Sequence, residues 1–178
     1  MRGLNIILIG MPGAGKSTIG VLLAKALGMR FIDTDIVLQE QENRLLHEII
    51  STDGIERFLE TEEAVVSSLK TENSVIATGG SVVYSSKAMN ALRGAGISVF
   101  LYVPFEEIER RLKNIKTRGV VIPEGKSLKD VYEERMPLYM AHSDIRLDCT
   151  GKDIETVVAE AIEALKKYSY AHYPVIIE

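Results

Sequence analysis

The chain has 178 residues, a formal net charge of −4, an apolar fraction of 46% and a charged fraction of 26%. This length suits about one domain, and the balance of apolar and charged residues excludes a disordered chain. The apolar runs are too short for a transmembrane helix, so no membrane partner is expected. The mildly acidic balance argues against a dedicated nucleic-acid binder. The only cysteine, Cys149, excludes an internal disulfide and a zinc site built from cysteines.

The amino-terminal segment carries a charge and an apolar run, as a signal peptide does. The run is short, however, and leads into a glycine-rich loop rather than a cleavage site of small residues. We therefore expect a cytoplasmic location. No linker rich in Ser, Gly or Pro divides the chain, and no repeat of the length typical of repeat proteins is present. Residues 1–178 are predicted to form a single domain.

Short apolar runs alternate with longer stretches of helical periodicity along the chain. Strands are predicted at residues 5–9, 31–32, 74–77, 97–103 and 145–147, and helices at 17–27, 35–51, 54–70, 85–92, 105–113, 127–140 and 153–168. This alternation predicts right-handed crossovers and a parallel sheet covered by helices on both faces. The predicted fold class is therefore α/β.

Two segments depart from this pattern. Residues 114–127 contain Gly119, Pro123 and Gly125, have mixed charge and no clean period, and are predicted to be a mobile surface segment between two helices. Residues 168–178 form a C-terminal extension rich in tyrosine. This extension either packs back on its own domain or adds a strand to a neighbouring sheet, which would support a dimer. We expect a monomer or a weak dimer.

A phosphate-binding motif lies between the first strand and the first helix. Residues 10–17 read GMPGAGKS and match G-x-x-x-x-G-K-[ST] at every fixed position. Glycines let backbone N–H groups surround a phosphate, and the helix N-terminus adds partial positive charge. Lys16 is expected to reach the β- and γ-phosphates, and Ser17 to offer its hydroxyl to Mg²⁺. The predicted nucleotide-binding residues are Gly13, Ala14, Gly15, Lys16, Ser17 and Thr18.

Several classes of enzyme use such a loop. The guanine-specifying N-K-x-D motif is absent, which argues against a GTPase. No hydrophobic run ends in an Asp-Glu pair, and the chain is short for a motor-type ATPase. A nucleotide kinase would need more arginines around a second phosphate-bearing substrate. A kinase of a small molecule is therefore favoured.

The second strand is followed by Asp33-Thr34-Asp35, at the edge where open α/β sheets place their ligands. Two carboxylates separated by one residue can point in different directions, one toward Mg²⁺ and the other toward an acceptor hydroxyl. Aspartate is also a common helix N-cap and turn residue, which is the structural alternative. Their position one strand–helix unit after the phosphate loop favours the functional interpretation.

The segments GMPGAGKSTIG, FIDTD, FLETEE, TGGS, NIKTRG and ERMPLY resemble the shikimate kinase family in order and spacing, over roughly residues 4 to 167. The resemblance implies a P-loop NTPase three-layer sandwich with a five-stranded parallel sheet of order 2-3-1-4-5, flanking helices and a lid at residues 114–127. It also implies a kinase that uses ATP and Mg²⁺ to phosphorylate a hydroxyl of a small polyhydroxy acid. Shikimate is the leading acceptor, with a role in aromatic amino acid biosynthesis.

The resemblance also assigns roles to residues at the metal and acceptor sites. Asp33 would assist Ser17 in holding Mg²⁺, and Asp35 would hydrogen-bond the acceptor hydroxyls and is a candidate base. Gly79 and Gly80 would bring backbone N–H groups to the acceptor or the phosphate.

Four cationic residues complete the implied site. Lys16 and Arg118 would be catalytic, with Arg118 closing from the lid onto the transferring phosphoryl group. Arg135 would pair with the substrate carboxylate, and Lys152 would lie near the adenine.

Three positions depart from the family pattern. Leu59 replaces the arginine of F-R-x-x-E, Ser81 replaces a third glycine, and Gly119 replaces the proline after the lid arginine. A leucine cannot replace a bidentate arginine–carboxylate contact. Two alternatives therefore remain open beside a shikimate kinase. One is a kinase of a different small hydroxy metabolite with a pocket changed at Leu59, and the other is a non-catalytic ATP-binding regulatory paralogue.

Other polar residues carry weaker signals. His47, like the other two histidines, shows no metal-ligand spacing and is predicted to be a surface or hydrogen-bonded residue. Arg111 is expected on the exposed face of a helix. Glu62 either positions Arg135 or belongs to an exposed acidic face.

Overall fold

A computed structural model describes residues 3–113 and 120–172. Five parallel strands form one sheet in the order β2-β3-β1-β4-β5, as the resemblance implied. The strands are β1 (Asn5–Ile9), β2 (Arg30–Asp33), β3 (Ser74–Ala77), β4 (Gly96–Tyr102) and β5 (Ile145–Asp148). Each prediction lies within one or two residues of the observed strand.

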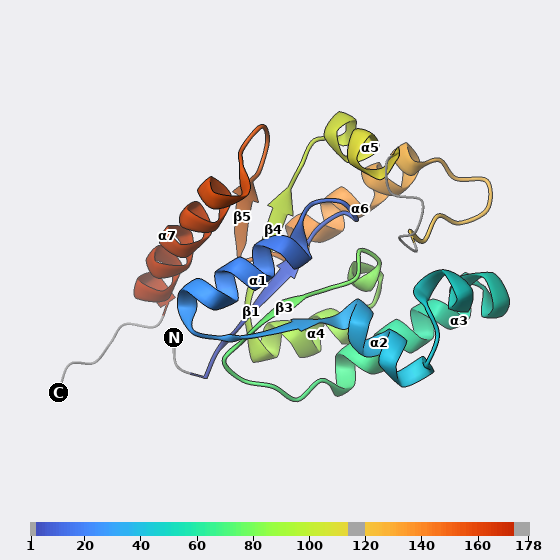
Figure 1. The fold of residues 1–178 in the computed structure, drawn as a ribbon, viewed down its shortest axis with the longest axis horizontal. Coiled ribbons are helices and arrows are strands. Elements are labelled where there is room, and N and C mark those ends of the chain that lie inside the picture. Colours follow the sequence, from blue (N-terminus) through green and yellow to red (C-terminus); the bar gives the residue numbers. More distant parts are fainter. Residues whose placement is uncertain (1–2, 114–119, 173–178) are drawn as a thin grey trace.

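Helices cover both faces of the sheet (Figure 1). The helices are α1 (Lys16–Leu27), α2 (Thr34–Glu42), α3 (Leu46–Ser68), α4 (Ser86–Ala95), α5 (Phe105–Lys113), α6 (Leu128–His142) and α7 (Ile154–His172), with a 3₁₀ turn η1 (Val82–Tyr84). Helices α1 and α7 pack together on one face, and α4 and α6 pack on the other. The result is the expected three-layer α/β sandwich.

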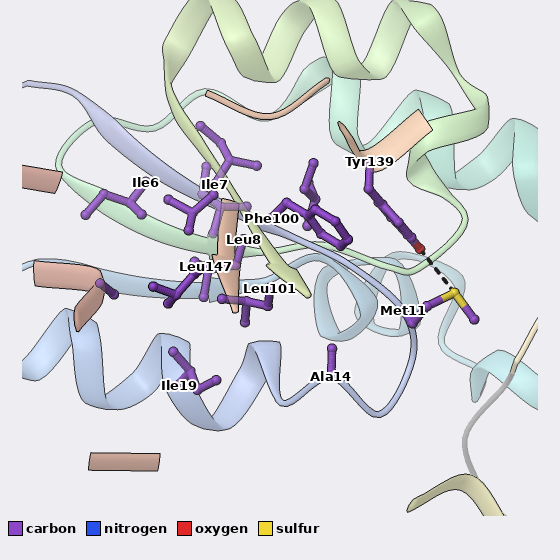
Figure 2. Packing of buried hydrophobic residues seen from close by; sticks show 14 of the residues in the cluster. Ile6, Ile7, Leu8, Met11, Ala14, Ile19, Phe100, Leu101, Tyr139 and Leu147 are labelled. Carbon is purple, nitrogen blue, oxygen red and sulfur yellow. Dashed lines mark hydrogen bonds between the residues drawn. The ribbon is translucent and has the colours of Figure 1, made fainter. Parts of the chain in front are cut away.

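The central strands consist of continuous apolar residues, as expected for strands that helices cover on both faces. All five residues of β1 are buried, and Ile7, Leu8 and Ile9 have no exposed surface. Figure 2 shows β1 beside β4, with Phe100 stacked on Tyr139 of α6 at 5.2 Å between ring centroids. The core therefore fixes the strand ends from which the loops of the site emerge.

Asn5 is a buried polar residue that connects the strands at the end of the sheet where they begin. Its amide nitrogen donates to the carbonyls of Thr71 at 2.8 Å and Ala95 at 3.2 Å, and its amide oxygen accepts from the Ser74 N–H at 3.1 Å. These bonds join the chain segments that enter β1, β3 and β4. The buried amide is fully used, which is why a polar residue can begin an otherwise apolar strand.

The region between β2 and β3 differs from its prediction. A single helix over residues 35–51 was expected, but α2 ends at Glu42 because Asn43 adopts a left-handed conformation with φ of 51°. Arg44 then bridges Glu42 and Asp53, at 2.8 and 2.7 Å, and secures the turn. The next helix, α3, begins at Leu46 and is broken by a kink at Gly54, whose φ of 83° and ψ of 168° are not helical, so a new helical segment does start where the second helix was predicted.

The end of the predicted lid packs against the body of the protein. Val121 is buried with Leu38, Ile49, Phe58 and Val65 in a second hydrophobic cluster, between α2 and α3. Residues 114–119, including Arg118 and Gly119, lie outside the described residues.

The C-terminal helix continues beyond its predicted end. Helix α7 extends to His172, so the first residues of the predicted C-terminal extension are helical rather than a strand. Tyr168 packs against the main core. Residues 173–178 of this extension lie outside the described residues. Within the described parts of the chain, no helix is long and apolar enough to cross a membrane.

Candidate active site

The carboxyl ends of β1, β2 and β3 open onto one cavity of about 400 Å³, which we call the central cavity. Parallel strands place these ends at the same edge of the sheet, which is where α/β folds bind ligands. The central cavity is lined by Pro12, Gly13, Gly15, Lys16, Ser17, Asp33, Asp35, Ile36, Gln39, Leu45, Leu46, His47, Phe58, Glu62, Thr78, Gly79, Gly80 and Ser81. The sequence-predicted phosphate loop, acidic pair and glycine pair therefore meet in one place.

The phosphate loop has the backbone that the motif predicts. Gly13 and Gly15 have φ of 83° and 95°, in the left-handed region that favours glycine. Gly15 is the N-cap of α1, so the loop delivers its N–H groups directly to the helix N-terminus. The Lys16 ammonium folds over the loop and donates to the carbonyls of Gly10 at 2.8 Å and Met11 at 3.0 Å. The arrangement is a preformed anion site.

A short chain of oxygens connects the loop to the acidic pair. The Ser17 hydroxyl donates to Asp33 Oδ2 at 2.6 Å, and Asp33 Oδ1 accepts from the Asp35 N–H at 3.0 Å. Asp33 thus caps α2 and faces Ser17, while Asp35 lies in the first turn of α2 and lines the same cavity. Two hard oxygen ligands side by side next to a phosphate site fit Mg²⁺, which takes few protein ligands and completes its shell with phosphates and water.

The glycine pair allows two carboxyl groups to approach the backbone. A Cβ on Gly79 would overlap Glu62 Oε1 and would lie 2.9 Å from Asp35 Oδ1. A Cβ on Gly80 would lie 2.6 Å from Pro12 Cδ of the phosphate loop. The Gly80 carbonyl accepts from the Tyr139 hydroxyl at 2.6 Å, which fixes the segment after β3. Side chains larger than hydrogen cannot be accommodated here without moving the site.

The surroundings of Glu62 shift the pKa of its carboxyl strongly. It is 3% exposed, and its Oε1 is a buried side-chain atom without a hydrogen-bond partner among the described residues. Burial raises the pKa of the Glu62 carboxyl to about 7, while a hydrogen bond from Ser81 opposes this increase. Asp35 adds to the increase by charge repulsion, and Arg135 and Lys16 reduce it. Perturbed acids of this kind cluster at functional sites.

Arg135 is buried immediately behind the central cavity. It has no exposed surface, its Nη2 donates to the Val121 carbonyl at 3.0 Å, and its Nε donates to the Tyr84 hydroxyl at 3.2 Å. Its guanidinium also lies over the Tyr84 ring, 5.0 Å from the centroid. A Cβ on Gly80 would be 3.2 Å from Arg135 Nη1, so the guanidinium packs closely against Gly80, and Arg135 does not line the central cavity.

A second cavity of about 340 Å³, the side cavity, opens on the other side of the phosphate loop. It is lined by Gly13, Ala14, Gly15, Thr18, Ile19, Arg111, Cys149, Lys152, Ile154 and Val157. The apolar wall suits a flat ring, and burial raises the pKa of the Cys149 thiol to about 11, so this cysteine is an unreactive wall residue. Lys152 pairs with Glu160 at 2.7 Å at its rim.

Sequence reasoning missed two residues that line these cavities. Arg111 was expected on an exposed helix face, but its Nη1 donates to the Gly13 carbonyl at 2.9 Å and its side chain lines the side cavity. His47 was treated as a surface residue, and it is exposed but also lines the central cavity. Neither belongs to a motif, so only the folded chain brings them to the site. Arg118 lies outside the described residues.

A comparison with protein families agrees with this geometry. The family model described as shikimate kinase matches residues 12–166. A shikimate kinase of Geobacter metallireducens is 40% identical over 160 residues, covering 88% of each chain. A shikimate kinase of Persephonella marina is 32% identical over 163 residues, covering 91% of this chain and 99% of the other.

Solved structures give the same result. A shikimate kinase of Acinetobacter baumannii in complex with shikimate is 27% identical, with a TM-score of 0.84 over 92% of this chain and 93% of the other. A shikimate kinase of Aquifex aeolicus is 32% identical, with a TM-score of 0.80 over 95% and 99% of the two chains. The chain therefore belongs to the shikimate kinase family, and with it to the ATP-binding P-loop phosphotransferases that have an alcohol group as acceptor.

Proposed function

We propose that this protein transfers the γ-phosphoryl group of ATP to a hydroxyl of a small polyhydroxy acid, with shikimate as the first acceptor to test. One observation carries the proposal. The phosphate loop and Asp35 face the same cavity of about 400 Å³, so a phosphate and a small acceptor can meet there. The shikimate bound by the Acinetobacter relative supports this choice of acceptor. It would give the protein a role in aromatic amino acid biosynthesis.

The phosphate loop would hold the donor. Backbone N–H groups of Gly13–Ser17 and the Lys16 ammonium would bind the β- and γ-phosphates, and Thr18 continues the loop at the side cavity. Ser17 and Asp33 would hold Mg²⁺. When bound, this ion neutralises charge on the phosphate oxygens.

The acidic pair and the glycine pair would bind the acceptor. Asp35 would accept a hydrogen bond from the reacting hydroxyl, orient it toward the γ-phosphate and take its proton as the new O–P bond forms. The bond between the γ-phosphorus and the β–γ bridging oxygen breaks in the same step, and ADP leaves. Gly80 would donate its backbone N–H group, and Gly79, whose N–H donates to the Thr34 hydroxyl at 3.1 Å, would exchange that bond for one to the acceptor. The alignment of acceptor and phosphate would then provide most of the rate enhancement.

Three cationic residues complete the proposal. Arg118 would close on the transferring phosphoryl group and stabilise its charge. Arg135 would contribute to the acceptor carboxylate contact after a small movement, since it is fully buried and does not line the central cavity. Lys152 would lie beside the adenine in the side cavity, where Arg111 supports the loop. A cytoplasmic location and a monomer or weak dimer remain predictions.

Leu59 favours a second candidate, a kinase of a different small hydroxy metabolite. The side chain lines a groove next to Glu62 in which the family pattern has a cation. A release assay for ADP, with ATP and Mg²⁺, tests both candidates using shikimate and a panel of hydroxy acids, sugars and amino alcohols. Turnover with shikimate supports the first candidate, and stimulation by another compound alone supports the second. ATP binding without stimulation by any acceptor would contradict both and favour a regulatory ATP-binding protein.

A further inference from the structure

A third cavity, of about 410 Å³, adjoins the central cavity and is strongly acidic. This acidic groove is lined by Glu56, Leu59, Glu60, Glu62, Glu63, Ser81, Tyr84 and Ser85. Glu62 and Ser81 line both cavities, so they form the boundary between them. The Glu63 carboxylate accepts a hydrogen bond from the Ser85 hydroxyl at 2.6 Å and forms an ion pair with Lys87 at 3.3 Å. Glu62, by contrast, presents a buried oxygen without a hydrogen-bond partner among the described residues.

Two nearby arginines direct their hydrogen bonds to groups other than Glu62. Position 59 lies one helical turn before Glu62 on the same face of α3, and it holds a leucine. Arg57 pairs with Glu60 at 3.2 Å. Arg135 donates to Val121 and Tyr84.

These contacts determine which charged groups surround Glu62 in the central cavity. Asp35 from α2, Lys16 from α1 and Arg135 from α6 are the charged groups that act on Glu62, and His47 lines the same cavity. Among the described residues, no arginine lines the central cavity. An acceptor bound beside Asp35 and Glu62 therefore meets two carboxyl groups that converge on Gly79.

We propose that Glu62 is a specificity-determining residue: its carboxylate accepts a hydrogen bond from a hydroxyl or ammonium group of the acceptor and disfavours a carboxylate at the same place. The inference rests on the proposed function, because it concerns the acceptor of that transfer. A buried carboxylate oxygen without a donor, such as Oε1 of Glu62, is costly, and an acceptor that supplies the donor removes that cost on binding. A carboxylate at this place would instead add repulsion between like charges in a poorly hydrated site.

The test compares three acceptors that share one ring. They carry a carboxylate (shikimate), a hydroxymethyl group or an aminomethyl group at the same carbon. The readout is the ratio of kcat/KM for each donor-bearing compound to that for shikimate, at pH 6 and pH 8.5. This ratio cancels the pH dependence of ATP and of every other group that both reactions share. We expect the ratio to rise about tenfold from pH 6 to pH 8.5 in the wild type, as Glu62 ionises.

Four variants sharpen the comparison. Glu62→Gln should make the ratio independent of pH, and Leu59→Arg should shift it about tenfold toward shikimate, because the guanidinium would pair with Glu62 one turn away. Glu63→Gln, which changes an acid of the groove outside the central cavity, should leave the ratio within twofold of the wild type. Leu59→Gln controls for size and polarity without charge. The hydroxymethyl and aminomethyl compounds distinguish a hydroxyl-binding site from an ammonium-binding site.

Calorimetry with the same compounds, in the presence of ADP and Mg²⁺, separates the inference from the proposed function. If none of the compounds is phosphorylated but Glu62→Gln still changes the ratio of binding constants, the proposed function fails and the specificity role stands. If the compounds are phosphorylated but the wild type and Glu62→Gln have the same ratio of kcat/KM values, the inference is overturned and the proposed function stands. Equal binding of all three compounds by the wild type and Glu62→Gln also overturns it.

Discussion

Replacing Glu62 by glutamine should remove a pH-dependent loss of stability. Burial raises the pKa of Glu62 from an ordinary value of 4.5 to about 7. Between these values the folded state holds a proton that the unfolded chain releases, so the free energy of unfolding falls as the pH rises from about 4.5 to 7. A displacement of this size corresponds to roughly 3 kcal/mol, at about 1.4 kcal/mol for each pKa unit. The full penalty is present above pH 7.

Urea denaturation of the wild type and Glu62→Gln at intervals from pH 5 to pH 8 measures this penalty. The difference between the two proteins should shift in favour of Glu62→Gln by roughly 2–3 kcal/mol over this range, since part of the transition lies below pH 5. Glu63→Gln is the matched control on the same helix. Hydrogen bonds from Ser85 and Lys87 lower the pKa of Glu63, so its ionisation lies below the measured range. Parallel stability curves for the wild type and Glu62→Gln would refute the argument that burial dominates at Glu62.

Three further substitutions test other parts of the account. Asn5→Ala removes a buried amide that pairs three backbone groups and should cost about 2–4 kcal/mol in urea denaturation; an unchanged midpoint would contradict the anchoring role. Gly80→Ala places a Cβ 2.6 Å from Pro12 Cδ, and kcat/KM for the acceptor should fall at least about tenfold with little change in melting temperature; wild-type kinetics would show that the segment yields freely. Arg111→Ala leaves the Gly13 carbonyl without its 2.9 Å partner, so KM for ATP should rise about tenfold while KM for the acceptor stays constant; an equal change in both would indicate a general loss of structure.

The parts of the fold that depend on local pattern could be predicted from the sequence. The continuous apolar run NIILI predicts a strand that is buried on both faces of the sheet. The phosphate-binding motif that follows it predicts both the turn and the start of α1. Asp33 and Asp35 were found because each has a fixed distance from this motif along the chain. The break at Asn43 was not predicted, because residues 39–44 are all polar and carry no apolar pattern that could mark it, while a single left-handed residue ends the helix.

Long-range contacts explain what the sequence could not predict. Arg111 reaches Gly13 across 98 residues of sequence, so its local helical pattern indicated an exposed position. Glu62 could be assigned either to an exposed face or to the site, because its burial depends on Gly79 and Asp35, which come from other elements. Arg135 was expected in the wall of the acceptor site, and its place behind Gly80 follows from contacts with Tyr84 and Val121.

The most direct test of phosphoryl transfer follows the γ-phosphoryl group itself. ATP labelled with ¹⁸O on the γ-phosphate is incubated with Mg²⁺, shikimate and either the wild type or Lys16→Met, and the products are analysed by mass spectrometry. The account predicts a labelled phosphate ester of the acceptor with the wild type, and loss of most of this product with Lys16→Met. Label found only in inorganic phosphate, or ester formation that does not depend on Lys16, would contradict it.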